Sequence, residues 1–158
     1  MSVTTLKEAA RSAATWRARG ERVVLANGCF DMLHVGHVRY LEGARSLGDR
    51  LVVAINSDAS VARLKGPGRP VLDEAARVAL VAGLAAVDLA FVFVTDDVVP
   101  ILETLSPDVH VKGTDYTRLT VPEASAAARL GIEVAIAGDP KDHSTRDLLL
   151  RLRGRPPA

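Results

Sequence analysis

Short runs of apolar, largely β-branched residues alternate along the chain with longer stretches in which apolar residues recur at helical spacing. The apolar runs predict five buried strands, at residues 22–27, 51–56, 88–94, 108–112 and 133–138. The stretches between and after them predict helices, at residues 38–49, 73–87, 97–105, 122–131 and 145–152. Residues 1–20 have an amphipathic pattern that predicts one more helix before the first strand.

This alternation predicts the architecture of the chain. Strands that are apolar on both faces need helical cover on each side, and consecutive parallel strands are joined by right-handed crossovers. We therefore expect an α/β fold, a Rossmann-like, doubly wound, five-stranded parallel sheet with helices on both faces. Such sheets bind ligands at the carboxyl ends of their strands, near the point where the strand order reverses.

Composition narrows the class of protein. The 158 residues suit one domain. Because 48% of them are apolar, a disordered chain is not expected. The formal net charge is only +1, so nonspecific electrostatic binding of nucleic acid is not expected either. Cys29 is the only cysteine, which is in keeping with a reducing compartment. Neither an export signal nor a stretch of the ~20 apolar residues needed for a membrane span is recognised. We therefore expect a cytoplasmic protein with no nucleic-acid or membrane partner.

The loop after the first predicted strand is the strongest candidate site. Residues 27–37, NGCFDMLHVGH, lead from that strand into a helix that begins near Val35. Free backbone amides and the positive end of the helix dipole gather at such a start. His34 and His37 share a helical face there, and Gly36 has no side chain to obstruct a phosphate. Because imidazole N–H groups donate to phosphate oxygens, the loop is predicted to bind nucleotide phosphates.

Other interpretations of this loop stay open at the level of sequence. A histidine at a helix start can cap the helix or lie on the surface, and a histidine pair can bind zinc. No cysteine or carboxylate cluster at ligand spacing accompanies this pair, so we predict no metal held by direct protein ligands. Cys29 has the character of a small packing residue rather than a nucleophile. Asp31 can cap the following turn.

Three segments together resemble a known family. They are NGCFDMLHVGHVRYLEGARSLGDRLVVAINSD, RLKGPGRPV and VKGTDY. The chain, over about residues 22–150, resembles the nucleotidyltransferases with a His-x-Gly-His motif, and among them most closely the D-glycero-D-manno-heptose 1-phosphate adenylyltransferases. The resemblance implies that a sugar 1-phosphate attacks the α-phosphorus of ATP, with Mg²⁺ as cofactor, and that pyrophosphate leaves. It also implies a homodimer. Together with the pattern along the chain, it predicts an N-terminal helix (1–21), a nucleotidyltransferase domain (22–153) and a frayed tail (154–158).

The same resemblance assigns roles to individual residues. Those expected to be catalytic are His34, His37 and Lys65. Those expected to bind the nucleotide are Asn27, Gly28, Cys29, Phe30, His34, Gly36, His37, Lys112, Gly113, Ser144 and Thr145. Those expected to bind the acceptor are Asp31, Asn56, Lys65, Arg77 and Asp115.

The chemistry fits a site that is rich in hydrogen-bond donors. A sugar 1-phosphate is already an anion, so it needs little general base, and stabilising the developing charge is the main requirement. Residues 63–70, RLKGPGRP, put three positive charges on a predicted mobile flap from which Lys65 reaches phosphates, with a plain solvated loop as the alternative. Arg77 would otherwise be an exposed helix arginine, and Lys112 a solvated residue of a strand-ending turn. Ser144 or Thr145 can simply cap the last helix.

Rival functions also remain at this level. A cytidylyltransferase acting on glycerol 3-phosphate is disfavoured because the arginine that such enzymes carry is absent near Asp139. Thr114 stands where the adenylyltransferases usually have glycine, and His143 and Arg146 also depart from the common pattern. A nucleotide-binding protein without activity is disfavoured by the intact histidines, and a redox Rossmann protein by the missing G-x-G-x-x-G sequence.

Overall fold

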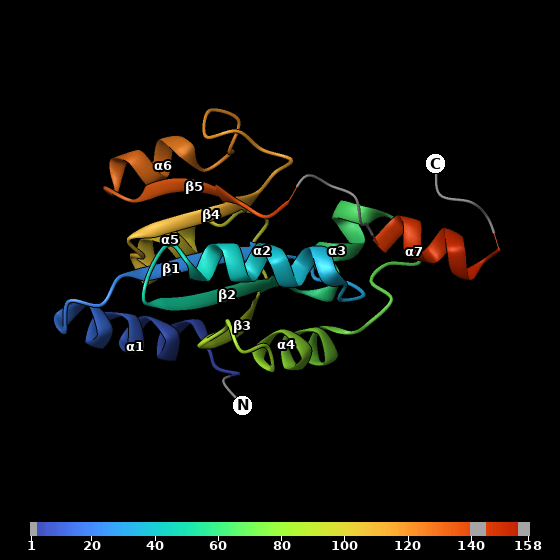
Figure 1. Cartoon of the computed structure of the whole chain (residues 1–158), viewed down its shortest axis with the longest axis horizontal. Coiled ribbons are helices and arrows are strands. Elements are labelled where there is room, and N and C mark those ends of the chain that lie inside the picture. The colour runs from blue at the N-terminus through green and yellow to red at the C-terminus, as the bar shows by residue number, and fades with distance from the viewer. Residues whose placement is uncertain (1–2, 140–144, 155–158) are drawn as a thin grey trace.

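The computed structural model describes residues 3–139 and 145–154, and the predicted sheet forms within them. Five strands, β1 (Val23–Gly28), β2 (Arg50–Asn56), β3 (Leu89–Phe93), β4 (Val109–Gly113) and β5 (Glu133–Ala137), pair in parallel in the order β3-β2-β1-β4-β5 (Figure 1). Each observed strand begins and ends within one residue of its prediction. The chain runs outward from β1 to β3 and then returns to β4, so the strand order reverses between β1 and β4.

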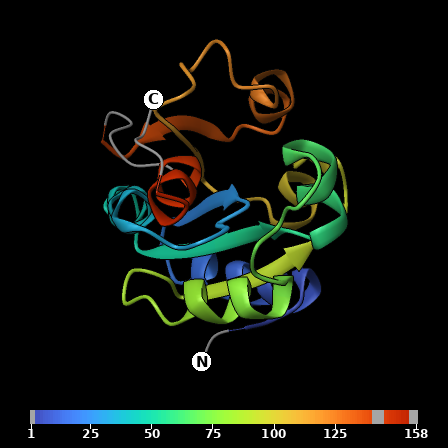
Figure 2. The same cartoon turned by 90° about the vertical axis from the view of Figure 1, so that its right-hand side faces the viewer.

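Helices cover both faces of this sheet, as expected. One face carries α2 (Val35–Arg45) and α4 (Glu74–Ala82), and the other carries α1 (Leu6–Ala18), α5 (Val99–Leu105) and α6 (Ala124–Arg129). The last helix, α7 (Thr145–Leu152), lies beyond the carboxyl ends of the strands (Figures 1 and 2). Among the described residues, no helix has both the length and the apolar character needed to cross a bilayer.

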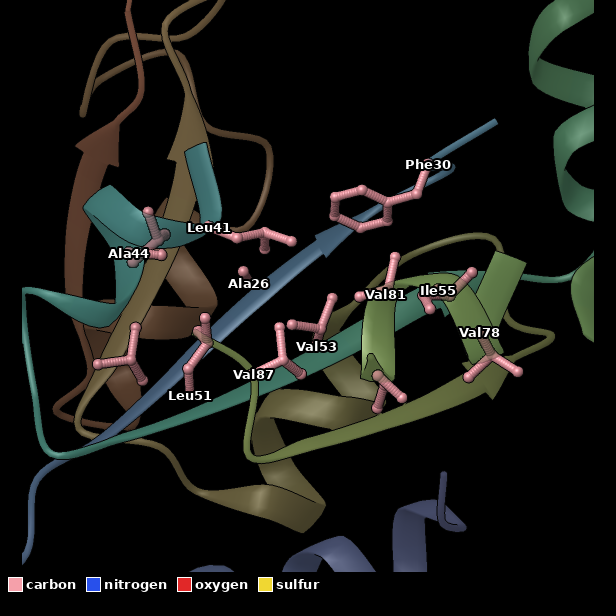
Figure 3. Close-up of a cluster of buried hydrophobic side chains, with 14 of the residues drawn as sticks. Ala26, Phe30, Leu41, Ala44, Leu51, Val53, Ile55, Val78, Val81 and Val87 are labelled. Carbon is pink, nitrogen blue, oxygen red and sulfur yellow. The ribbon is translucent and has the colours of Figure 1, made fainter. Parts of the chain in front are cut away.

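Alternation within the strands divides the core into two apolar clusters. Val24 and Ala26 of β1 point toward α2 and α4, where they join Leu41 and Val81 (Figure 3). Val23 and Leu25 point to the opposite face, toward α1 and α5. β1 and β2 pack against helices on both faces, which is why they read as nearly continuous apolar runs.

One helix was missed, and it corrects the expected flap. Residues 58–65 form α3 (Asp58–Lys65), which Ser57 caps by accepting from the Ser60 amide and which ends at Gly66 in a left-handed conformation. Lys65 therefore lies on the last helical turn rather than on a loop, and only Arg69 of the three cations follows in the loop. The glycines and prolines after Lys65 suggested a loop, but they only end the helix.

Candidate active site

The loop that leaves β1 emerges where the strand order reverses. β1 lies between β2 and β4, so the loop that leads to α2 leaves the sheet between the carboxyl ends of these two strands. Gly36 belongs to the first turn of α2. The first amides of α2 and the positive end of its dipole therefore point toward this edge. The predicted phosphate-binding position is thus present in the fold.

The two histidines of the motif are held together at this helix start. His34 is the N-cap of α2, and its backbone N–H donates to Nδ1 of His37 at 3.3 Å. Their rings stack with centroids 3.8 Å apart, and both side chains are half-buried. Because Nδ1 of His37 accepts a hydrogen bond, the proton of the neutral ring lies on Nε2, which is then a donor. The two rings therefore form one compact group in which Nε2 of His37 is a donor.

Backbone strain is concentrated in the loop just before the histidines. Phe30 and Met32 both adopt left-handed conformations, with φ of 49° and 53°, which non-glycine residues rarely do. The Phe30 ring is buried and packs 5.3 Å from the His37 ring. A Cβ at Gly28 would lie 3.1 Å from that ring, so the ring would have to shift by a few tenths of an ångström to admit a side chain there. Gly28 and Phe30 therefore shape the base of the histidine pair.

Asp31 joins this loop to the segment before α4. Its buried carboxylate accepts from the backbone amides of Val71 and Leu72 and from Nε of Arg69, which lies 2.7 Å away. Burial raises the pKa of the Asp31 carboxyl, but the amide hydrogen bonds and Arg69 outweigh it and hold the pKa below its usual value. In the described structure, the Asp31 carboxylate therefore holds the loop to the segment before α4.

Arg77 lies inside the protein, contrary to the expectation of an exposed helix arginine. It is fully buried on α4, and its guanidinium donates to the carbonyls of Leu72 and Cys29 and to the carboxylate of Asp58. The planar guanidinium can reach three acceptors at once, which a lysine cannot do. Arg77 thus ties the loop after β1 to the start of α3.

Strand register places a row of polar side chains on the opposite face of the sheet from α2. His110 pairs with Leu25, and Asn56 pairs with Phe93, so these residues and Asn27 face the side of α1 and α5. Nε2 of His110 lies 3.1 Å from Oδ1 of Asn27, and Asn56 donates to Ser60. The site therefore straddles the sheet edge, with the histidine pair on one side and this row on the other.

Lys112 continues the row, and it is not solvated. It is buried, its Nζ lies 3.3 Å from Oε1 of Glu123, and it sits 5.5 Å from the centre of the Tyr116 ring. The alternative of a solvent-exposed turn lysine is therefore wrong. Glu123 keeps a second buried oxygen, Oε2, that has no hydrogen-bond partner among the described residues.

Cys29 is half-buried, and its surroundings favour the protonated thiol. Burial raises the pKa of the thiol above its usual value, although Lys65 and Arg77 oppose the shift. The sulfur lies 3.8 Å from Oδ1 of Asn56, which accepts its weak hydrogen bond. A protonated thiol is a poor nucleophile, in agreement with the sequence-based expectation.

The carboxyl end of β4 and the start of α7 also lie at the edge of the sheet that carries the candidate site. Gly113 ends β4, and the hydroxyl of Thr114 donates to the carbonyl of Asp139 at 2.9 Å, so the departure from glycine ties this turn to the end of β5. Thr145 donates to the carbonyl of Asp31 at 2.5 Å, which brings the start of α7 to the loop after β1. Asp115 is exposed in the turn after β4. The predicted site residue Ser144, and the neighbouring His143, fall outside the described residues.

Sequence reasoning missed two residues of this edge, His110 and Glu123. The signal for His110 was present, because a histidine between two valines of an apolar strand is a polar residue in a buried position. Glu123 precedes a short alanine-rich helix and gave no signal, since only the fold brings it to Lys112. In the part of the chain that the structure describes, no group of three or more metal-ligating side chains is placed to hold an ion.

A doubly wound parallel sheet with a histidine pair at the helix start beside its switch point defines the class of Rossmann-like nucleotidyltransferases. A family model described as cytidylyltransferase-like matches residues 25–147 of the chain. The chain belongs to this cytidylyltransferase-like family.

Individual relatives agree with this assignment. The chain is 50% identical to the bifunctional protein HldE of Acidiphilium cryptum over 151 residues, which cover 96% of this chain and 31% of that protein. It is 49% identical to the bifunctional protein HldE of Azotobacter vinelandii over 139 residues, covering 88% of this chain and 29% of that protein. The chain thus spans less than a third of the length of these relatives.

A solved structure shares the fold. The crystal structure of the lipopolysaccharide core biosynthesis protein from Thermoplasma volcanium GSS1 matches with a TM-score of 0.66 at 30% sequence identity. The match covers 77% of this chain and the whole of that chain.

Proposed function

We propose that the chain transfers the adenylyl group of ATP to a heptose 1-phosphate, which yields ADP-heptose and pyrophosphate. The observation that carries the proposal is the stacked His34 and His37 pair at the start of α2, set at the switch point of the sheet. The resemblance to heptose 1-phosphate adenylyltransferases and the identity of about half to the HldE proteins support this choice of substrates. The chain covers only part of those proteins, so the activity is proposed for this segment.

In this mechanism the acceptor phosphate oxygen attacks the α-phosphorus of ATP, and the bond to the pyrophosphate oxygen breaks. The acceptor is already an anion, so no residue has to remove a proton. His34 and His37 donate to the oxygens on which negative charge grows, and the α2 amides add to this stabilisation. Lys65, at the exposed end of α3, neutralises charge shared by the two substrates.

The remaining predicted site residues are proposed to act around this centre. Lys112 and Gly113 border the nucleoside, and Asn56 and Asp115 are placed to meet the acceptor. Asp31 and Arg77 support the site indirectly in this proposal, because their polar groups are bonded within the protein. Thr145 brings α7 to the loop that meets the triphosphate.

Mg²⁺ is proposed to enter with ATP. It prefers phosphate oxygens and water to an all-protein cage, which fits a site that presents donors and, in its described part, no cluster of metal ligands. The ion would offset negative charge on the phosphates. We also propose a cytoplasmic homodimer, which size-exclusion chromatography with light scattering would check.

The assay that tests this function measures pyrophosphate release. ATP, CTP, GTP and UTP are each combined with both anomers of D-glycero-D-manno-heptose 1-phosphate, with other sugar 1-phosphates and with glycerol 3-phosphate. We expect release with ATP and a heptose 1-phosphate, and its loss when the divalent ion is chelated. Release with CTP and glycerol 3-phosphate, but not with ATP and heptose phosphate, would overturn the assignment in favour of a cytidylyltransferase.

The histidine roles are tested in the same assay. His34→Ala and His37→Ala should each lower kcat by roughly 100- to 1000-fold while changing the affinity for ATP far less, because the donors act on charge that develops in the transition state. Val35→Ala, at an exposed position between them, is the matched control and should leave both quantities unchanged. Equal losses in kcat and in ATP affinity would instead mean that the histidines only bind the ground state.

A further inference from the structure

His110 is a buried polar residue that the mechanism above does not use. It is the second residue of β4 and has no exposed surface, and it lies on the sheet face that Leu25 shares. Its Nε2 meets Oδ1 of Asn27 at 3.1 Å, whereas Nδ1 has no hydrogen-bond partner among the described residues. A leucine would fill an apolar strand position without leaving a polar atom unpaired, so the histidine calls for an explanation.

The protonation state of this imidazole follows from its surroundings. Burial, with a smaller contribution from the charge of Lys112, lowers the pKa of His110 to about 3, so the ring is neutral at physiological pH. A neutral imidazole has one N–H donor. The Oδ1 atom of Asn27 can only accept, so the proton lies on Nε2 and Nδ1 keeps a lone pair.

This hydrogen bond determines which way the Asn27 amide faces. With Oδ1 held by His110, the amide NH₂ group has no acceptor among the described hydrogen bonds, and the Asn27 side chain is only half-buried. Asn27 is the penultimate residue of β1, directly before the loop that carries the histidine pair. An NH₂ group fixed at this edge can donate to an oxygen of a bound anion, whereas a freely rotating amide would present its oxygen half of the time.

We propose that His110 is a positioning residue, which holds the Asn27 carboxamide so that its NH₂ group donates to a phosphate oxygen of the bound nucleotide. The inference rests on the proposed nucleotide site. The Asn27 carboxamide would contact the phosphates from the sheet face opposite α2, whereas the histidine pair contacts them from the face of α2. His110 itself touches no substrate.

The test is a double-mutant cycle on kcat/KM for ATP. His110→Leu removes the donor, and the fall should be roughly tenfold, about what losing one well-placed hydrogen bond to a charged group costs. Asn27→Ala should lower kcat/KM at least as much. In the Asn27→Ala background, His110→Leu should cause no further fall, because nothing remains to be positioned. His110→Gln, whose amide can also donate to Oδ1, should restore part of the activity.

Stability measurements separate positioning from folding. His110→Leu should unfold at the same or a higher temperature than the original chain, since an apolar side chain replaces a polar one that is incompletely paired. Val109→Ala, one residue away on the opposite face, is the matched control, and it should lower stability while leaving kcat/KM of the folded protein unchanged. Losses from His110→Leu and Asn27→Ala that simply multiply would overturn the inference.

A measurement without substrate keeps the inference distinct from the proposed function. Nitrogen NMR of the imidazole in the isolated chain should show the proton of His110 on Nε2, and a proton on Nδ1 would overturn the inference. An active chain with additive mutations defeats only the role of His110. A chain that neither binds nor turns over any nucleoside triphosphate defeats the proposed function, and the role of His110 with it.

Discussion

At the residue scale, the loop at residues 27–37 contains side chains that differ in burial and in what they contact. His34 and His37 are half-buried at the sheet edge, whereas Asp31, three residues before the first of them, is almost completely buried and bonded within the protein. Its carboxylate accepts from two amides and from Arg69. A short stretch of sequence therefore combines the histidines that we propose to meet the nucleotide with groups that hold the loop in a strained conformation.

Asp31→Asn should destabilise the protein at neutral pH. The new amide would face the amide of Val71 and the guanidinium of Arg69 with a donor where an acceptor is needed, and we expect a loss of roughly 1–3 kcal/mol in the free energy of unfolding. Urea unfolding at neutral pH measures it. A change below a few tenths of a kcal/mol would show that Asp31 does not hold the loop.

The same substitution has a pH signature. Asp31 has a lowered pKa in the folded protein, so its contribution is complete above the unfolded value of about 3.9 and is lost as the pH falls through the folded value. The stability difference between the original chain and Asp31→Asn should thus be constant near neutral pH and shrink below about pH 4. A difference that grew on acidification would contradict this assignment.

At the scale of elements, buried polar contacts fix how α3 and α4 meet the loop after β1. Arg77 reaches Cys29 and Asp58, and the amide of Asp58 in turn donates to the carboxylate of Glu74 at the start of α4. The apolar clusters hold α4 on the sheet, but apolar contacts are not directional. They do not by themselves fix where the first turn of α4 lies relative to the loop after β1. The guanidinium does so, because its donors point in fixed directions.

Arg77→Met should cost stability and distort the site. The change leaves the carbonyls of Leu72 and Cys29 without their donor, and we expect roughly 1–3 kcal/mol of lost stability, with weaker ATP binding. Arg77→Lys should recover only part of the loss, since one ammonium cannot span three acceptors. Chemical denaturation and calorimetric titration with ATP are the measurements.

An exposed arginine provides the control for Arg77. Arg63 on α3 forms an ion pair with Asp96 in which both side chains are more than half exposed. Arg63→Met should therefore change the free energy of unfolding by less than about 1 kcal/mol. Equal losses from the two substitutions would mean that the burial of Arg77 is irrelevant to stability.

At the scale of the whole molecule, the sheet and its two helical layers share two apolar clusters, and no residue of α7 belongs to either. None of its residues is buried, and it lies beyond the strand ends with Thr145 bonded to the carbonyl of Asp31 (Figures 1 and 2). An element with little buried surface opens at a small free-energy cost. We therefore expect the hydrogen bond from Thr145 to contribute to the order of α7.

Thr145→Val should loosen α7 without unfolding the domain. We expect faster hydrogen exchange in α7 and an increase of several-fold in KM for ATP, while the free energy of global unfolding stays within about 0.5 kcal/mol. Thr104→Val, which removes a comparable hydroxyl contact to Pro100 on α5, is the control and should leave KM unchanged. Unchanged exchange in α7 would show that this contact does not hold the helix.

Much of the fold was predictable because its signals are local. An apolar run between helical patterns identifies a buried parallel strand by itself, and all five strands were found in this way. The missed α3 shows the limit, since a short helix that ends in lysine and glycine has too few apolar positions to stand out. Its formation depends on the Ser57 cap and on packing after β2.

For the loop that carries the histidine pair, too, only some properties follow from the local sequence. The sequence by itself determined that two histidines stand at a helix start after a buried strand, because helical spacing and dipole direction follow from local geometry. It also determined the family, through several segments in a fixed order. These properties need no knowledge of what lies across the sheet.

Only the tertiary structure decided what the side chains around the histidines contact. Asp31 meets Val71, Arg77 meets Cys29 and His110 meets Asn27 across gaps of 40, 48 and 83 residues. A pattern of residue types records that a charged or polar group is present, but not which distant strand or loop the fold sets beside it. The direction of each donor was decided by strand register and helix placement.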